Sequence, residues 1–164
     1  ANKVVPKDIV ILGMGGVAKA VIAFLHDILL SKYKNTKLFA ASRKRDKDFV
    51  SRFNQLHYIK WEDRTSCIGN RTLVVNCTNL GDYESPEYIP IDINSIKDDK
   101  LPLGIYDVIY NPCETKLLRW ANSKGINHSN GLKMNLIQAA LAFKYATNID
   151  LGSDKIMKAM NEIK

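Results

Sequence analysis

The sequence predicts a single α/β domain built on a doubly wound parallel sheet. The chain has 164 residues, which is a usual size for one domain. Its hydrophobic share of 46% and charged share of 25% are close to globular averages and exclude a wholly disordered chain. Short β-rich runs alternate with longer stretches of helical periodicity, the pattern that produces a parallel sheet with crossover connections.

Each expected strand is a short run of β-branched and other apolar residues. The run at 8–12 is the clearest, because it is apolar after its first residue and a glycine follows it. Apolar residues at three- and four-residue spacing predict a long helix after that glycine, and Ser153 is a good N-cap for a terminal helix. We expect strands at 8–12, 38–41, 57–61, 72–76 and 106–110, and helices at 15–33, 48–54, 115–124, 132–147 and 153–163.

Residues 81–104 contain three prolines and are expected to form a loop with at most one short helix. We find no internal repeat and no sign of a second domain.

The charge balance narrows the possible partners. Lys and Arg number 24 against 17 Asp and Glu, a net charge of +7, which suits nucleic acid, an anionic membrane surface or a phosphorylated ligand. Nucleic acid is the weaker choice, because the basic residues cluster at one loop without an aromatic stacking platform. The longest apolar stretch, 17–30, is too short and too polar to span a bilayer.

The three cysteines, Cys67, Cys77 and Cys113, have no C-x-x-C spacing. We therefore expect neither a disulfide framework nor a metal site, and a reducing compartment such as the cytoplasm.

A glycine-rich turn stands between the first expected strand and helix. The run from Gly13 to Ala18 satisfies G-x-G-x-x-A, in which Gly13 permits the tight turn and Gly15 lets the backbone approach a pyrophosphate. The phosphates would lie on the helix N-terminus. The motif predicts a Rossmann-type dinucleotide site, and the alternative is a glycine turn without a ligand.

The end of the second expected strand indicates which dinucleotide is bound. NAD-binding domains usually place an acidic residue there, on the ribose 2′-hydroxyl. Here the strand end is Ser42-Arg43-Lys44, and the two cations would pair with a 2′-phosphate. The sequence therefore predicts NADP, and the alternative is a solvated basic loop.

Three polar segments, NCTNLG at 76–81, DVIYNP at 107–112 and NGLKM at 130–134, are expected at the carboxyl edge of the sheet, where open α/β folds bind ligands. Together with GMGGVAKA, SRKR, YDVIYNPCETKLL and NGLKMNLIQAALAF, they resemble the cofactor domain of the shikimate dehydrogenase family over nearly the whole chain.

That resemblance implies NADPH-dependent reduction of 3-dehydroshikimate to shikimate in aromatic amino-acid biosynthesis. The family has an N-terminal substrate domain and a C-terminal cofactor domain, and we expect residues 1–164 to be the second alone. Its Lys–Asp pair for proton transfer lies in the first domain. We therefore expect no catalytic residue in this chain, and an isolated chain without activity.

The resemblance also implies roles for individual residues. The diphosphate is expected at Gly13, Gly15, Gly16 and Val17, and the 2′-phosphate at Ser42, Arg43, Lys44 and Lys47. Thr78, Asn79 and Leu80 are expected beside the cofactor. Val108, Gly131 and Met134 are expected on its nicotinamide side. Those expected at the substrate are Tyr110 and Gln138.

The chain departs from the family pattern at Lys133, where a glycine is usual, at Asp82, where an apolar residue is usual, and at Lys44, which replaces a small polar residue. Two other functions stay open: a close relative that oxidises quinate, and a non-catalytic NADP-binding regulatory module. Turnover after the upstream sequence is restored would separate an enzyme from a module.

Overall fold

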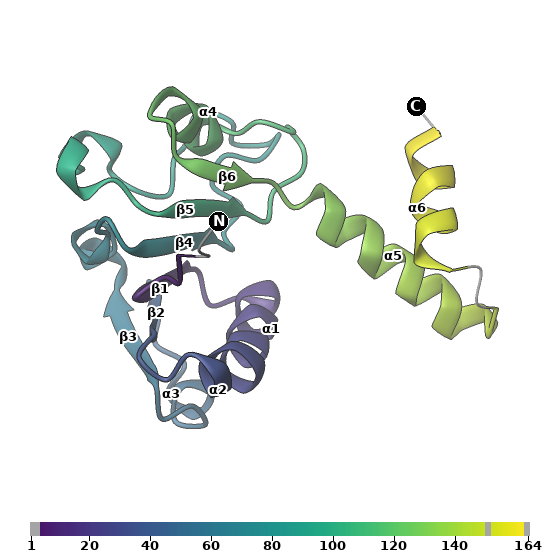
Figure 1. The fold of residues 1–164 in the computed structure, drawn as a ribbon, viewed down its shortest axis with the longest axis horizontal. Coiled ribbons are helices and arrows are strands. Elements are labelled where there is room, and N and C mark those ends of the chain that lie inside the picture. The colour runs from purple at the N-terminus through teal and green to yellow at the C-terminus, as the bar shows by residue number, and fades with distance from the viewer. Residues whose placement is uncertain (1–3, 150–151, 163–164) are drawn as a thin grey trace.

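The computed structural model describes residues 4–149 and 152–162, and these residues form one fully parallel sheet (Figure 1). Its strand order is β3-β2-β1-β4-β5-β6. The strands are β1 (Asp8–Leu12), β2 (Lys37–Ser42), β3 (Leu56–Lys60), β4 (Thr72–Asn76), β5 (Gly104–Asp107) and β6 (Asn127–Ser129). The chain thus winds outward from β1 in both directions, which is the order of doubly wound dinucleotide-binding folds. The predicted fold class is confirmed.

The helices are α1 (Gly16–Phe24), α2 (Leu30–Lys32), α3 (Lys47–Val50), α4 (Lys116–Ser123), α5 (Leu132–Thr147) and α6 (Ser153–Glu162). A π-helical stretch over Leu25–Leu29 joins α1 to α2. The single α-helix expected at 15–33 is therefore a continuous helical segment whose middle part is π-helical. The helix α3 is shorter than expected and is capped by Asp46, whose side chain accepts from the amide of Phe49.

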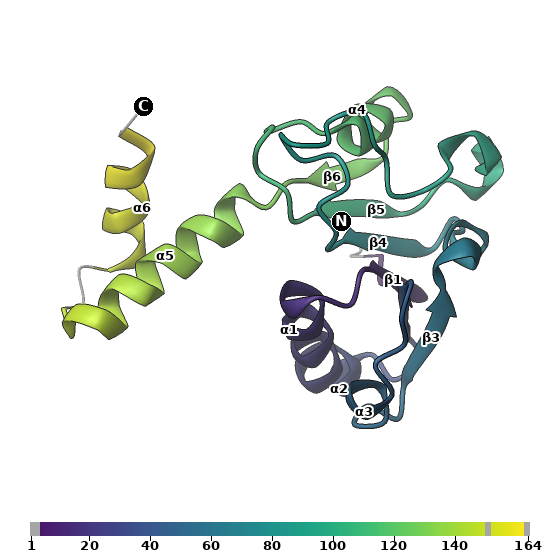
Figure 2. The same cartoon turned by 180° about the vertical axis from the view of Figure 1, so that it is seen from behind.

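The central strand β1 contributes side chains to the apolar core on both faces of the sheet. Its side chains alternate, so that Ile9 and Ile11 pack in the apolar cluster that includes α1, whereas Val10 and Leu12 pack in the cluster that includes α4. All four side chains are almost completely buried. Figures 1 and 2 show α1 and α4 on opposite sides of the sheet.

An irregular segment replaces a helix between β4 and β5. Residues 77–103 contain two short 3₁₀ helices, Ile93–Ser95 and Asp98–Lys100, one more than the single short helix that the sequence allowed for this loop. Ile91 is 1% exposed, and Ile89 and Leu101 also pack against the α4 side of the sheet. The segment therefore covers apolar sheet surface that a crossover helix would otherwise cover.

The helix α5 leaves the sheet, and α6 folds back near its outer end (Figure 1). Within α5, Ala140 is the residue classed as buried, whereas Leu141, Phe143 and Tyr145 are exposed. The start of α5 is fixed at Gly131, where a Cβ atom would overlap the backbone of Val108.

Three details of the strands also differ from the sequence expectations. The fifth strand ends at Asp107, not at residue 110, because the chain turns there and the Asp107 carboxylate accepts from the amide of Ile109. The edge strand β6 is not predicted by the pattern, since its three residues are polar and exposed. The expected third strand includes Trp61, but this residue begins a 3₁₀ turn after β3.

A buried carboxylate joins the ends of β4 and β5 to the start of α4. Asp107 is completely buried. Its Oδ1 atom accepts from Asn76 Nδ2 at 3.0 Å and from the Ile109 amide at 3.2 Å, and its Oδ2 atom accepts from Thr115 Oγ1 at 2.8 Å. Burial raises the pKa of Asp107 above its ordinary value, although the three donors act in the opposite direction.

We predict that Asp107→Asn lowers the free energy of unfolding by about 1–3 kcal/mol, because an amide nitrogen would then face one of these donors and leave it unpaired. Denaturant unfolding followed by circular dichroism measures the change. Asp99→Asn, at an exposed carboxylate, is the control and should unfold like the unchanged chain. Equal stability of the Asp107 and Asp99 variants would contradict the role given to this network.

Candidate functional site

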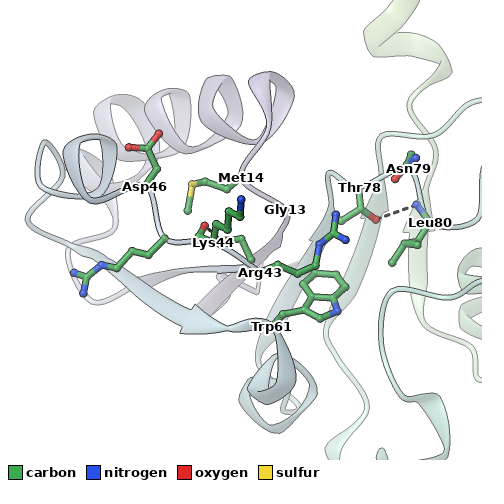
Figure 3. Close-up of a pocket in the computed structure, with 11 residues that line it drawn as sticks. Gly13, Met14, Arg43, Lys44, Asp46, Trp61, Thr78, Asn79 and Leu80 are labelled. Carbon is green, nitrogen blue, oxygen red and sulfur yellow. Dashed lines mark hydrogen bonds between the residues drawn. The ribbon is translucent and has the colours of Figure 1, made fainter.

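A cleft of about 840 Å³ lies at the carboxyl edge of the sheet (Figure 3). Four segments line it, each at or just beyond the carboxyl end of one of the strands β1 to β4. The lining residues are Gly13, Met14, Ser42, Arg43, Lys44, Arg45, Asp46, Trp61, Thr78, Asn79 and Leu80.

The glycine turn leaves room for an anion at one side of this cleft. Gly13 has a φ of +109°, and a Cβ there would lie 3.0 Å from the carbonyl oxygen of Cys77, so only glycine fits. A Cβ on Gly15 would meet nothing within 4 Å. No side chain caps α1, and its first turn holds no acidic residue. The first N–H groups of α1 are therefore open to a phosphate.

A basic loop after β2 forms the opposite side. Arg43 and Lys44 are exposed, and no carboxylate among the described residues forms an ion pair with either of them. The Ser42 hydroxyl donates to the carbonyl of Lys44 at 2.6 Å, and Tyr58 donates to the carbonyl of Ser42 at 2.8 Å. Figure 3 shows Arg43 extending toward Thr78, past the indole of Trp61.

The loop after β4 is held by the buried network described above. Asn76 Oδ1 accepts from the Thr78 amide at 3.0 Å and from Thr78 Oγ1 at 2.7 Å. Thr78 Oγ1 in turn accepts from the Leu80 amide at 3.2 Å, the bond dashed in Figure 3. In the same loop, burial raises the pKa of the Cys77 thiol to about 12, so the thiol is protonated at neutral pH.

The structure gathers part of the predicted cofactor set in this cleft. Of that set, the lining contains Gly13, Ser42, Arg43, Lys44, Thr78, Asn79 and Leu80. The members outside the lining are Gly15, Gly16, Val17, Lys47, Val108, Gly131 and Met134. Gly15, Gly16 and Val17 are nevertheless exposed at the start of α1, directly after the lining residue Met14. The two predicted substrate residues, Tyr110 and Gln138, are both exposed.

The structure shows the surroundings of two residues that depart from the family pattern, Asp82 and Lys133. The Asp82 carboxylate accepts from the amides of Glu84 and Ser85 and from the Ser85 hydroxyl, so it closes a local turn. Lys133 is exposed in the first turn of α5.

Sequence reasoning missed four lining residues: Met14, Arg45, Asp46 and Trp61. Trp61 is the most informative, since the Arg64 guanidinium lies 4.1 Å from the centre of its ring and holds the indole in place. The available signal was an aromatic residue at the carboxyl end of a predicted strand.

Within residues 4–149 and 152–162, no helix has both the length and the apolar character needed to cross a membrane. In the same ranges, no three His, Cys, Asp or Glu side chains come together as a metal site.

No protein-family model matches the chain. A shikimate dehydrogenase (NADP(+)) from Thermosynechococcus vestitus is 32% identical to it over 143 residues, which cover 84% of this chain and 48% of that protein. The crystal structure of shikimate dehydrogenase 1 from Peptoclostridium difficile matches with a TM-score of 0.74 and 26% identity, covering 96% of this chain and 55% of that one.

The shikimate 5-dehydrogenase of Thermus thermophilus, solved in complex with NADP(H) and shikimate, matches with a TM-score of 0.68 and 25% identity. That alignment covers 96% of this chain and 56% of that one. The chain therefore spans about half the length of the proteins it matches. Sequence and fold together show that this chain belongs to the shikimate dehydrogenase family.

Proposed function

We propose that this chain binds NADP(H) and is the cofactor domain of an enzyme that reduces 3-dehydroshikimate to shikimate in aromatic amino-acid biosynthesis. One observation supports this most: a single cleft joins the glycine turn before the uncapped start of α1 to Arg43 and Lys44. A dinucleotide with an additional phosphate is the ligand that such a pair of anion sites suits. The NADP(+)-dependent relative and the NADP(H) complex of the Thermus enzyme agree with it.

Bound NADPH would supply the hydride that reduces the substrate carbonyl. The residues of this chain would bind the cofactor and orient it toward the substrate. The first amides of α1 would hold the diphosphate, Arg43 and Lys44 the 2′-phosphate, and Val108, Gly131 and Met134 would lie on the nicotinamide side. Tyr110 and Gln138 would contact the substrate, and their exposure leaves both free to do so.

Reduction of a ketone also needs a proton donor for the new hydroxyl. We propose that a separate N-terminal substrate domain supplies it through a Lys–Asp pair, and that residues 1–164 are the cofactor domain only. We also propose a reducing compartment, the cytoplasm, because Cys67, Cys77 and Cys113 are all free thiols.

We predict that the chain binds NADP(H) more tightly than NAD(H), and that Arg43→Ala removes most of the difference. A well-formed bond from a charged donor contributes roughly 1.5–3 kcal/mol, so this substitution should weaken NADP binding about tenfold to a hundredfold and NAD binding little. Calorimetric titration with both cofactors measures this. Equal affinities in the unchanged chain would overturn the NADP assignment.

We predict that Trp61→Ala weakens NADP and NAD binding to the same extent, roughly tenfold, because the indole would stack on the adenine that both cofactors share. Trp61→Phe should retain most of the affinity. This pattern differs from that of Arg43→Ala, which discriminates between the cofactors. Unchanged affinities in Trp61→Ala would show that the adenine lies elsewhere, and thermal unfolding of each variant controls for loss of structure.

We predict that the chain alone binds cofactor but oxidises no shikimate. Loss of substrate positioning removes a contribution of roughly 7–11 kcal/mol to barrier lowering, in addition to the loss of the acid–base pair. The formation of NADPH, followed by its absorbance, should be seen only with a longer form that includes an N-terminal substrate domain. Comparable rates from the two forms would place the chemistry in this chain.

A further inference from the structure

An acidic side chain lies in the otherwise basic loop of the cleft. Asp46 lines the same cleft as Arg43, Lys44 and Arg45, and Figure 3 shows it on the side nearest α1. A carboxylate at the end of the second strand is what favours NAD in dinucleotide-binding domains, because it accepts from the ribose 2′-hydroxyl and repels a 2′-phosphate. Asp46 therefore opposes the selectivity that its neighbours should produce, unless its charge is balanced.

Lys19 balances that charge from another element. It lies on α1, the helix whose start borders the cleft, and its Nζ atom donates to Asp46 Oδ2 at 2.6 Å. The other carboxylate oxygen, Oδ1, accepts from the Phe49 amide at 2.9 Å and so caps α3. Lys19 Nζ also lies 5.3 Å from the centre of the Phe49 ring. The bond to Lys19 is the main cause that lowers the pKa of Asp46, so the carboxyl is ionised and paired at neutral pH.

We propose that Lys19 is a specificity-determining residue, which secures the preference for NADP over NAD by neutralising Asp46 beside the 2′-phosphate site. The proposal rests on the NADP-binding function proposed above. Lys19 is not in the cleft lining, so it acts through Asp46 and not as a phosphate ligand. Its side chain is 38% exposed and that of Asp46 34%, which makes the pair a partly screened one with a modest effect.

The test is a charge cycle measured by calorimetric titration with NADP and NAD. Lys19→Met removes the ion-pair partner of Asp46 and leaves only the weaker electrostatic effect of Arg52, so it should lower the ratio of NADP to NAD affinity about fivefold with little change in NAD binding. Lys19→Arg should keep the ratio. Asp46→Asn keeps a good N-cap for α3, and in the double variant Lys19→Met/Asp46→Asn it should restore the ratio. The loss in Lys19→Met should be larger at low ionic strength.

The chain contains a matched control pair away from the cleft. Lys124 Nζ donates to Asp98 at 2.7 Å, and the Lys124 side chain is 39% exposed, against 38% for Lys19. Lys124→Met should leave the affinity ratio unchanged. Thermal unfolding of all variants shows whether any of them has lost structure.

Each other outcome overturns the proposal in a distinguishable way. An unchanged ratio in Lys19→Met would show that Asp46 does not influence the phosphate site. An equal loss for both cofactors would show that the pair only tethers α3 to α1. Failure of Asp46→Asn to restore the ratio would make Lys19 a direct phosphate ligand. An unchanged chain without a preference for NADP would overturn the proposed function as well, before any variant is compared.

Discussion

The geometry of the cleft depends on one buried carboxylate. Asp107 is fully buried, and hydrogen bonds from three donors, near the ends of β4 and β5 and at the start of α4, offset the loss of hydration of its carboxylate. Because a buried carboxylate without partners is costly, these three chain segments cannot shift relative to one another without loss of stability. Asn76 passes this constraint to the cleft, since its amide donates to Asp107 while its carbonyl oxygen positions Thr78. The side of the cleft formed by the β4 loop is therefore fixed from the core.

The opposite side of the cleft is stabilised by weaker interactions, which lie near the surface of the protein. The loop after β2 is shaped by the Ser42 hydroxyl bond, by the N-cap of Asp46 and by the ion pair of Asp46 with Lys19, all partly exposed. Substitutions there change charge without opening the core, because none of these side chains belongs to the two apolar clusters. The structure thus separates a rigid side, which sets position, from a side whose charge can set selectivity.

In the strands at 8–12 and 72–76, local pattern and burial agree, because both are mostly buried runs rich in β-branched residues, and both have the bounds that the sequence predicted. The helix α5 also has its predicted bounds, although most of its apolar side chains are not buried, so its periodicity alone predicted it. The edge strand β6 could not be predicted in this way, since Asn127–Ser129 has neither apolar residues nor burial and pairs only through its backbone. Arg43 and Lys44 followed from the motif, whereas Trp61 and the Lys19–Asp46 pair depend on contacts between distant segments.

Gly131 has a packing role that does not depend on a bound cofactor. The resemblance assigns it to the nicotinamide side, yet a Cβ there would overlap the Val108 backbone whether or not a cofactor is bound. Its amide also donates to the carbonyl of Ile109 at 3.1 Å, which ties the start of α5 to the segment after β5. A substitution at Gly131 would therefore displace the start of α5, and a loss of cofactor binding in such a variant would not by itself show a contact with the nicotinamide. Met134 lies in the first turn of α5 and is partly exposed, and a change to its side chain introduces no Cβ against the Val108 backbone, so the nicotinamide role is better judged there.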